Sequence, residues 1–359
     1  MKITPKLMIV GRMPPPYGGV TVHLNRLTQH LKAEHYPFQF CDLSGRTNQN
    51  GGFIPCGNIF ELVWNLLSNP YEMAHCHASN PWLFLLVDFF VVRILRRKTI
   101  YTLHGEGILL LCESGPFLIK RLLRGAFKRA TRIITINSNC EERVMRFVSS
   151  HENVLQMPAY LPPTPTEMVP DQPYSDEIEL FFKDHSMCFA AQGTFGNQYQ
   201  GVDLYRFDLL GKALSNLRTK HPHAGLCTLV SQTLDQAARE KVFSLRRDLD
   251  LERHWLILEH FGAAIPIYLR CVAFIRPTMS DGDSLSVREC LDLGIPVVAS
   301  NAVPRPAGCI LFQSGDLGSL ESSLIALLED YPVCQLQAQQ SNSSNCLEPL
   351  LACYRSVLS

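Results

Sequence analysis

The stretch from Arg276 to Gly294, RPTMSDGDSLSVRECLDLG, carries the clearest fold signal in the chain. Short apolar runs flank it, CVAFI before and IPVVAS after, and both are typical of buried strands. Asp283 and Ser284 are good N-cap residues, and Gly294 suits the left-handed position that ends a helix. We therefore predict a strand, a loop, a helix that begins near Ser284, and a second strand.

The predicted helix start is suited to a phosphorylated ligand. Unpaired backbone N–H groups and the helix dipole favour an anion there, so we expect Ser284 and Leu285 to bind a phosphate. Asp281 lies in the loop on one side of this point, and Glu289 lies on the helix. Two carboxylates so placed can hold hydroxyl groups at opposite ends of a sugar nucleotide. Acids at both ends of a short helix are also common on protein surfaces, so spacing alone does not decide.

Apolar, strand-like runs alternate with helix-length segments along the whole chain, which predicts parallel sheets covered by helices on both faces. The predicted strands are LMIVGRM, FQFCDL, MAHCHA, TIYTLH, RIITIN and NVLQMP in the first half, and MCFAAQG, GLCTLVS, HWLILE, VAFIRP, IPVVAS and CILFQ in the second. The proline-rich stretch from Met157 to Glu177 is typical of a linker. We expect α/β domains at residues 1–165 and 166–340, with their sheets facing a common cleft, and a C-terminal helix at 341–359.

The composition excludes several classes of protein. The 33 basic and 33 acidic residues leave no net charge to attract nucleic acid. Thirteen cysteines without a CxxC pair indicate buried thiols in a reducing compartment. The apolar run in KLMIVGRM is too short to be typical of a signal peptide, so we expect a cytoplasmic protein. The longest apolar stretch, from Pro81 to Leu95, is interrupted by Asp88 and Arg93, which favours a buried amphipathic helix over a membrane span.

The pair Asp281-x7-Glu289 resembles the carboxylate signature of the retaining glycosyltransferases of family 4, which have the GT-B fold of two Rossmann-like domains. PVVAS and the later RPAGCILFQSGD resemble the C-terminal half of that family, and a bacterial branch shows a similar R-x-T-x-x-D-G-D-S-x-S-x-R-E pattern. The family usually has Glu at the first position, so Asp281 is a shortened version. The resemblance implies that Asp281 lies near the transferred sugar and that Glu289 binds the ribose hydroxyls. It also implies that the last helix packs on the first domain.

Motifs in the first half extend the resemblance. PPYGGV is similar to the family's glycine loop, which implies that Gly18 and Gly19 approach the donor phosphates, although a simple tight turn fits them equally. His104 follows TIYTL and is similar to the family histidine that contacts the donor sugar, while a lone histidine is often structural. His75 and His77 share one strand face, but no third ligand follows at zinc-like spacing, so we expect no metal site.

The loop AAQGTFGNQYQGVDL departs from the family, whose members carry an Arg and a Lys there that neutralise the donor diphosphate. Thr194 stands in place of the arginine and Gln200 in place of the lysine, and we expect Gly193 and Thr194 to bind the donor. The loss is serious, because a charge-assisted hydrogen bond contributes about 1.5–3 kcal/mol.

Either the site is inactive or other cations have replaced the missing pair. Arg276, Arg288 and Arg305 lie in the same short region of the sequence. We hypothesise that Arg276 and Arg288 are the cations that bind the diphosphate.

The predicted function is transfer of a sugar, with retention, from a nucleotide diphosphate donor to a glycan or lipid-linked glycan in cell-surface polysaccharide synthesis. No metal or other cofactor is expected. The expected catalytic residues are His104, Asp281 and Glu289, and the expected donor-binding residues are Gly18, Gly19, Gly193, Thr194, Arg276, Asp283, Ser284, Leu285 and Arg288. The alternatives are a catalytically silent GT-B subunit that binds glycan or supports a partner enzyme, and a nucleotide-sugar epimerase.

The basic segment from Lys120 to Arg132 has Leu and Phe between its cations. It is either a solvated helix face or a patch that rests on anionic lipid at the inner face of the membrane. Donor sugar, nucleotide base, acceptor and oligomeric state are not set by the sequence.

Overall fold

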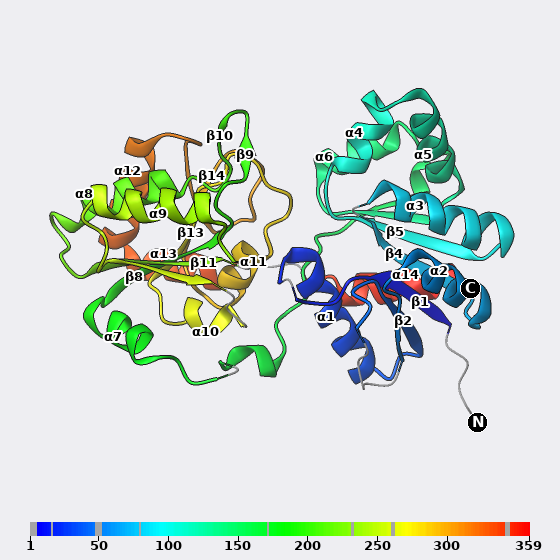
Figure 1. Ribbon diagram of the computed structural model, residues 1–359, viewed down its shortest axis with the longest axis horizontal. Coiled ribbons are helices and arrows are strands. Elements are labelled where there is room, and N and C mark those ends of the chain that lie inside the picture. Colours follow the sequence, from blue (N-terminus) through cyan, green and yellow to red (C-terminus); the bar gives the residue numbers. More distant parts are fainter. Residues whose placement is uncertain are drawn as a thin grey trace. The chain divides into compact units, whose positions relative to one another are not determined.

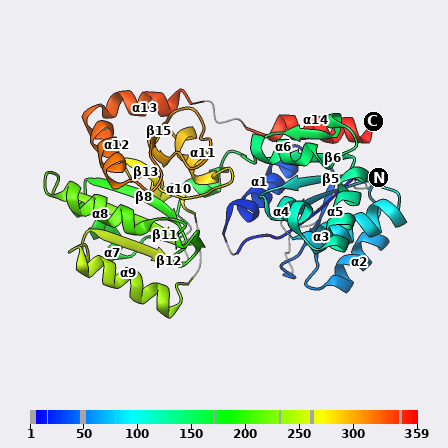
Figure 2. The same cartoon turned by 90° about the horizontal axis from the view of Figure 1, so that it is seen from above.

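The computed structural model describes residues 6–15, 17–46, 52–78, 80–170, 172–230, 233–259, 263–341 and 345–359. The chain divides into two compact units, Met1–Leu161 with Ser344–Ser359, and Pro162–Ser343. Each unit is an α/β fold built around its own parallel sheet (Figures 1 and 2). Pro16 of the glycine loop and Ser231 at the end of a predicted strand lie outside the described residues.

The sheet of the first unit has the strand order β3-β2-β1-β4-β5-β6-β7, and its paired strands are parallel. The strands are β1 (Leu7–Gly11), β2 (Phe38–Asp42), β3 (Phe53–Pro55), β4 (Met73–Ala78), β5 (Lys98–Leu103), β6 (Arg132–Thr135) and β7 (Val154–Gln156). Successive strands run outward from β1 on one side and from β4 on the other, so the order reverses between β1 and β4. Open α/β sheets bind ligands at such a switch point, beyond the carboxyl ends of the strands.

Helices cover both faces of this sheet. They are α1 (Gly19–Ala33), α2 (Ile59–Ser68), α3 (Pro81–Val87), the π-helical η1 (Asp88–Ile94), α4 (Gly107–Ser114), α5 (Phe117–Arg129), α6 (Ser138–Met145), the short η2 (His151–Asn153) and α14 (Leu347–Leu358). Leu27 of α1 and Tyr354 of α14 share one buried cluster, so the last helix of the chain completes the core of the first unit. In Figure 2 this red helix lies among the elements of the first unit. In the described part of the chain, no helix combines the length and apolar character needed to cross a bilayer.

The sheet of the second unit has the order β12-β11-β8-β13-β14-β15, again with parallel pairs. The strands are β8 (Met187–Gly193), β11 (Ala224–Val230), β12 (Trp255–Glu259), β13 (Ala273–Arg276), β14 (Val297–Ser300) and β15 (Cys309–Phe312). The order reverses between β8 and β13, which makes the loops after these two strands neighbours at a second switch point. A small antiparallel hairpin, β9 (Gln198–Tyr199) and β10 (Val202–Asp203), follows β8.

Helices lie on both sides of this sheet as well, with α8 and α9 on one side and α7 and α10 on the other in Figure 1. The helical segments are η3 (Pro165–Met168), α7 (Asp176–Asp184), α8 (Phe207–Arg218), α9 (Gln236–Asp248), α10 (Ile265–Tyr268), α11 (Leu285–Asp292), α12 (Leu317–Glu329) and α13 (Tyr331–Gln339). After α11, Gly294 has a φ of 70° and donates its N–H to Leu291, so it takes the predicted left-handed position.

The twelve predicted strands are all present, and the predicted fold class of two parallel-sheet α/β domains is confirmed. The sequence did not predict β3 or the β9–β10 hairpin, because two- and three-residue strands are too short to show an apolar period. Among the described residues there is no disulfide, and eleven of the thirteen cysteines are buried, as expected for thiols.

Candidate functional site

The loop between β13 and α11 lies at the switch point of the second sheet. Helix α11 begins at Leu285 with Ser284 as its N-cap, as predicted. The Ser284 side chain makes no capping hydrogen bond, so the first turn lacks the side-chain acceptor that a serine in this position usually supplies. An anion placed here can serve as the missing acceptor and gains a favourable interaction with the helix dipole.

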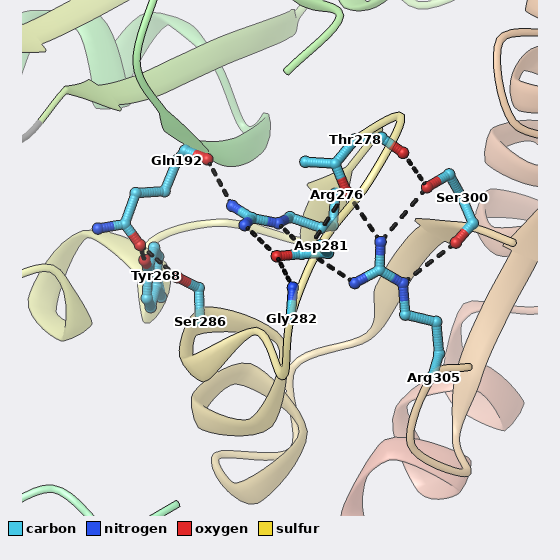
Figure 3. A network of polar contacts seen from close by, with 9 residues as sticks. All are labelled: Gln192, Tyr268, Arg276, Thr278, Asp281, Gly282, Ser286, Ser300 and Arg305. Atoms are coloured by element: carbon cyan, nitrogen blue, oxygen red, sulfur yellow. Dashed lines mark hydrogen bonds and ion pairs between the residues drawn. The ribbon is translucent and has the colours of Figure 1, made fainter. Parts of the chain in front are cut away.

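Asp281 is the centre of a network of polar contacts in this loop (Figure 3). Arg276 binds it with two parallel hydrogen bonds, from Nε to Oδ2 at 2.8 Å and from Nη2 to Oδ1 at 3.0 Å. Arg305, which follows β14, donates Nη1 to Oδ2 at 2.9 Å. Thr278 Oγ1 and the Gly282 N–H donate to the same carboxylate at 3.3 and 3.1 Å. Five donors therefore meet one carboxylate, which has about four lone-pair positions.

The charges in this network fix the ionisation state of Asp281. Burial alone would raise the pKa of its carboxyl, but the charges and hydrogen bonds of Arg276 and Arg305 outweigh burial and lower that pKa to about 2. Asp281 in turn raises the pKa of Arg276 above its usual value, against the effect of burial. The Asp281 carboxylate and the Arg276 guanidinium are therefore charged at neutral pH.

Arg305 is held from several sides. In addition to its bond with Asp281, Arg305 donates Nη2 to Thr278 Oγ1 at 2.9 Å and Nε to the Ser300 carbonyl at 3.1 Å (Figure 3). Ser300 Oγ in turn donates to the Thr278 carbonyl at 2.6 Å. Its side chain is only 2% exposed. The sequence placed Arg305 near Arg276 and Arg288, in the loop that follows a predicted buried strand. It gave no sign that Asp281 is the partner of Arg305.

The second hypothesised cation is also paired within the loop. Arg288 donates Nε to Asp283 Oδ1 at 2.6 Å, and both side chains are largely buried. The three guanidinium groups and the two carboxylates that they bind carry a net charge of +1 between them. Arg276 and Arg288 reach a diphosphate only by sharing or exchanging these internal partners. Glu289, on the same helix, is 5% exposed.

Gln192, near the end of β8, connects its strand to α11. Its carbonyl accepts Arg276 Nη1 at 2.9 Å, and its side-chain oxygen accepts Tyr268 at 2.7 Å and a short hydrogen bond from Ser286 (Figure 3). Gln192 was not singled out from the sequence. Its contacts with Arg276 and Ser286 fix the distance between the two loops at the switch point.

The loop after β8 is shaped by close packing and by the hairpin. A Cβ on Gly193 would lie 2.2 Å from the Tyr205 ring, so only glycine fits there. Thr194 Oγ1 accepts a hydrogen bond from Asn197 at 2.7 Å. Gln200 is exposed between β9 and β10, where it adopts a φ of 51°. The family's lysine position is therefore a turn residue in this chain.

Arg206, at the N-cap of α8, is a cation that sequence reasoning missed. It binds Asp208 at 2.9 Å and places Nη1 3.7 Å from Met279 Sδ in the loop after β13. The left-handed φ of 46° at Arg206 gave no signal in the sequence. Its contact with Met279 places another guanidinium beside the Asp281 loop.

A second polar cluster lies at the switch point of the first sheet. His104, at the end of β5, accepts or donates a 2.9 Å hydrogen bond between its Nε2 and Nδ1 of His77 on β4. His23 on α1 completes a group in which one nitrogen of each imidazole lies within 4.8 Å of the others. Burial lowers the pKa of His23 to about 4 and holds those of His77 and His104 well below their usual value, so all three rings are neutral.

His75, predicted to be structural, is enclosed by hydrogen bonds. Its Nδ1 meets the Tyr354 hydroxyl at 2.7 Å and its Nε2 meets Thr102 Oγ1 at 2.8 Å. In the glycine loop nearby in the sequence, Gly18 caps α1 in an extended conformation and Gly19 begins the helix. A Cβ on either glycine would meet no atom within 4 Å, so packing does not require glycine there.

No protein-family model matches the sequence, and no curated protein sequence matches it either. Solved structures do match over nearly the whole chain. The structure is similar to HepE from Anabaena in complex with UDP and glucose, with a TM-score of 0.70 and 12% identity over 98% of this chain and 99% of that one. It is also similar to sucrose-phosphate synthase from Thermosynechococcus elongatus, with a TM-score of 0.71 and 13% identity over 99% of each chain.

A third similar structure is the catalytic domain of starch synthase IV from Arabidopsis thaliana bound to ADP and acarbose, with a TM-score of 0.66 and 11% identity over 99% of this chain and 100% of that one. These neighbours are GT-B glycosyltransferases. At such identities the similarity establishes the fold, and the chain has the GT-B fold.

Proposed function

We propose that the protein is a retaining glycosyltransferase similar to family 4, which moves a sugar from a nucleotide diphosphate donor to a glycan or lipid-linked glycan acceptor in cell-surface polysaccharide synthesis. The observation that carries the proposal is the Asp281 loop, where Arg276 and Arg305 meet a helix start without a side-chain cap at the sheet's switch point. The fold neighbours HepE and starch synthase IV were solved with UDP and ADP, so this fold accommodates nucleoside diphosphates.

In this proposal the donor diphosphate binds the N–H groups of Ser284 and Leu285 at the start of α11. The diphosphate draws Arg276 and Arg288 away from their internal partners, because phosphate oxygens also accept the paired hydrogen bonds of a guanidinium. Asp281 then loses the two donors of Arg276, which leaves the Gly282 N–H on Oδ1, and this oxygen becomes available to a hydroxyl of the transferred sugar. Glu289 binds the ribose hydroxyls. Binding is thus an exchange of charged partners, which limits the cost of removing charges from water.

The transfer itself breaks the bond between the anomeric carbon and the diphosphate oxygen, and forms a bond from the acceptor oxygen to the same face of that carbon. The diphosphate oxygen takes the acceptor's proton, so no separate base is needed. The arginines and the helix dipole stabilise the departing diphosphate, and His104 and Asp281 position the sugar. Gly18, Gly19, Gly193 and Thr194 bring backbone close to the donor. Since these groups supply the neutralisation, the proposal includes no metal in the transfer step.

The first test is release of nucleoside diphosphate from a panel of nucleotide sugars in the presence of glycan acceptors. We expect at least one donor to be turned over, and we expect Arg276→Ala to lower the rate about 100- to 1000-fold, because one stabiliser of developing charge is lost. Arg270→Ala is the matched control, since Arg270 pairs with the exposed Glu179 in the same unit. A panel without any turnover, or equal rates in the two variants, contradicts the proposal.

A second test addresses stereochemistry and the carboxylate. We expect the anomeric configuration of the donor to be retained in the product, as seen by proton NMR. Asp281→Asn keeps the shape of the side chain but removes the charge that holds Arg276 and Arg305, so its transfer rate should fall more than its affinity for the donor. An inverted product would overturn the retaining assignment.

We also propose that α5 contacts anionic membrane. The helix Phe117–Arg129 contains no acidic residue, and its Phe117 and Leu118 side chains are 73% and 65% exposed. A groove beside the helix is lined by Arg93, Phe117, Lys120, Arg121, Leu122, Arg124, Gly125, Lys128 and Arg129. Cations interleaved with exposed apolar side chains match the surface of an anionic bilayer.

Sedimentation with vesicles that contain phosphatidylglycerol tests this contact. The double variant Lys120→Glu and Lys128→Glu should lose binding, because each cation contributes about 1 kcal/mol near an anionic surface. The control is Lys212→Glu with Lys220→Glu, two exposed positions of the second unit. Equal sedimentation of both double variants contradicts the membrane contact.

A further inference from the structure

The three histidines of the first unit are arranged as the ligands of a metal ion. His23 comes from α1, His77 from β4 and His104 from the end of β5, so three separate elements converge on one point. The ring centres of these residues are 5.3, 5.4 and 5.2 Å apart, which is nearly an equilateral triangle. We propose that His23, His77 and His104 form a binding site for a divalent transition metal of the zinc class.

The dimensions of this triangle fit tetrahedral coordination. Zinc bound by imidazole nitrogens at about 2.0–2.1 Å holds those nitrogens roughly 3.4 Å apart and the ring centres roughly 5 Å apart. The nearest pair in the cluster, His77 Nδ1 and His104 Nε2, is 2.9 Å apart. The rings therefore need to separate by only a fraction of an ångström to admit the ion.

One nitrogen of the cluster is unpaired within the described ranges. His77 is only 3% exposed, and its Nε2 is buried without a hydrogen-bond partner among the described residues. A buried polar atom without a partner costs about 1–3 kcal/mol. Hydrogen bonds among the described residues therefore leave this ring partly unsatisfied, and its other nitrogen, Nδ1, which faces His104, is the one that an ion within the triangle would bind.

The surroundings orient the His23 ring as rings are oriented in known metal sites. His23 donates Nδ1–H to the Ala159 carbonyl at 3.1 Å, which leaves its Nε2 lone pair available. Metal-bound histidines almost always make such a bond with their second nitrogen. His75 is not a fourth ligand, because both its nitrogens are hydrogen-bonded, but its ring packs 4.2 Å from that of His77 and supports it.

The ligand type narrows the choice of ion. Three neutral imidazoles without a carboxylate suit zinc, copper or nickel rather than calcium or magnesium. Three protein ligands also leave one coordination position open. The proposed function places His104 against the donor sugar. An ion that is coordinated by His104 keeps this side chain from the sugar. Metal binding should therefore lower transfer, a consequence that rests on the proposed function, whereas the site itself does not.

The test uses the full chain, stripped with a chelator and titrated with Co²⁺ as a visible probe. We expect one equivalent of Co²⁺ to bind with the absorption typical of tetrahedral coordination, and Zn²⁺ to displace it. His23→Gln and His77→Gln should each weaken Co²⁺ binding at least tenfold. His254→Gln is the matched control, because it changes a histidine that pairs with His185 in the second unit. Far-UV circular dichroism checks that each variant is folded.

Absence of Co²⁺ binding by the wild-type chain overturns the site without any variant. Undiminished binding in both His23→Gln and His77→Gln overturns it as well. In a separate arm, Zn²⁺ should inhibit the release of nucleoside diphosphate by the wild type and not by His23→Gln. Inhibition that persists in His23→Gln overturns the proposed effect on transfer, and loss of all transfer in metal-free protein counts against the proposed function instead.

Discussion

Both units place polar side chains at the switch point of their sheet, but the two groups are satisfied in opposite ways. In the second unit, Asp281 receives five donors, and the three arginines of the loop and helix start are each paired with a carboxylate. In the first unit, neutral imidazoles are packed together, and Nε2 of His77 has no partner in the described part of the chain. The comparison teaches that the paired charges of the second site suit the exchange of one anion for another, as the proposed function requires. The first gathers three neutral imidazoles with one nitrogen of each within 4.8 Å of the others, and suits a cation.

The largest effect expected of a single substitution on stability concerns Arg305, whose side chain is 2% exposed. Arg305→Met removes one of the two guanidinium groups that pair with the buried Asp281 carboxylate. The free energy of unfolding should therefore fall by about 3–5 kcal/mol. The measurement is urea denaturation. As a control, Arg239→Met breaks the more exposed pair with Glu259 and should cost at most about 1 kcal/mol. An equal loss of stability in the two variants would contradict the account of Arg305 and Asp281 as a buried network.

The second effect separates the two clusters by pH in metal-free protein. Burial lowers the pKa of His23 to about 4 and that of His75 to about 3, whereas the unfolded state titrates near 6.5. Below that value the unfolded state binds more protons, so the first unit loses about 1.4 kcal/mol per pH unit for each such histidine as the pH falls from 6.5 toward 4.

Asp281 behaves differently, because its folded pKa is about 2 and its unfolded value about 3.9. Its contribution is complete above pH 4 and is lost only as the pH falls toward 2. Stability measured by urea between pH 7 and 3 should therefore decline first in the first unit. A flat profile between pH 6.5 and 4.5 would contradict the burial of the neutral histidines.

The smallest effect compares two glycine loops. Gly193→Ala drives a Cβ into the Tyr205 ring and should destabilise the second unit by about 1–3 kcal/mol. The new Cβ in Gly19→Ala meets open space in the first turn of α1. The free energy of unfolding, measured by thermal denaturation, should therefore change by no more than about 0.5 kcal/mol. If Gly19→Ala nevertheless weakens donor binding, the glycine is there for the ligand. An equal loss of stability in both variants would remove this distinction.

The sequence predicted the regular parts of the molecule well. The apolar runs gave the strands of both large sheets except β3, and capping chemistry gave the start of α11 at Ser284 and its end at Gly294. These features depend on residues close together in the chain, which is why periodicity and turn preferences report them.

What the sequence did not predict depends on contacts between distant residues. The hydrogen bond between Arg305 and Asp281 connects residues 24 positions apart in the sequence, and the bond between Arg276 and Gln192 connects residues 84 positions apart. The histidine cluster draws on α1, β4 and β5, so a search for ligands at zinc-like spacing could not find His23. The hairpin that carries Gln200 was missed because each of its strands has two residues.

The most direct test of the central claim is a crystal structure with the nucleoside diphosphate that raises the melting temperature most. The account predicts diphosphate oxygens within hydrogen-bond distance of the backbone N–H groups at the start of α11, with Arg276 turned from Asp281 toward the phosphate. A diphosphate bound elsewhere, with the Asp281 network unchanged, would contradict it.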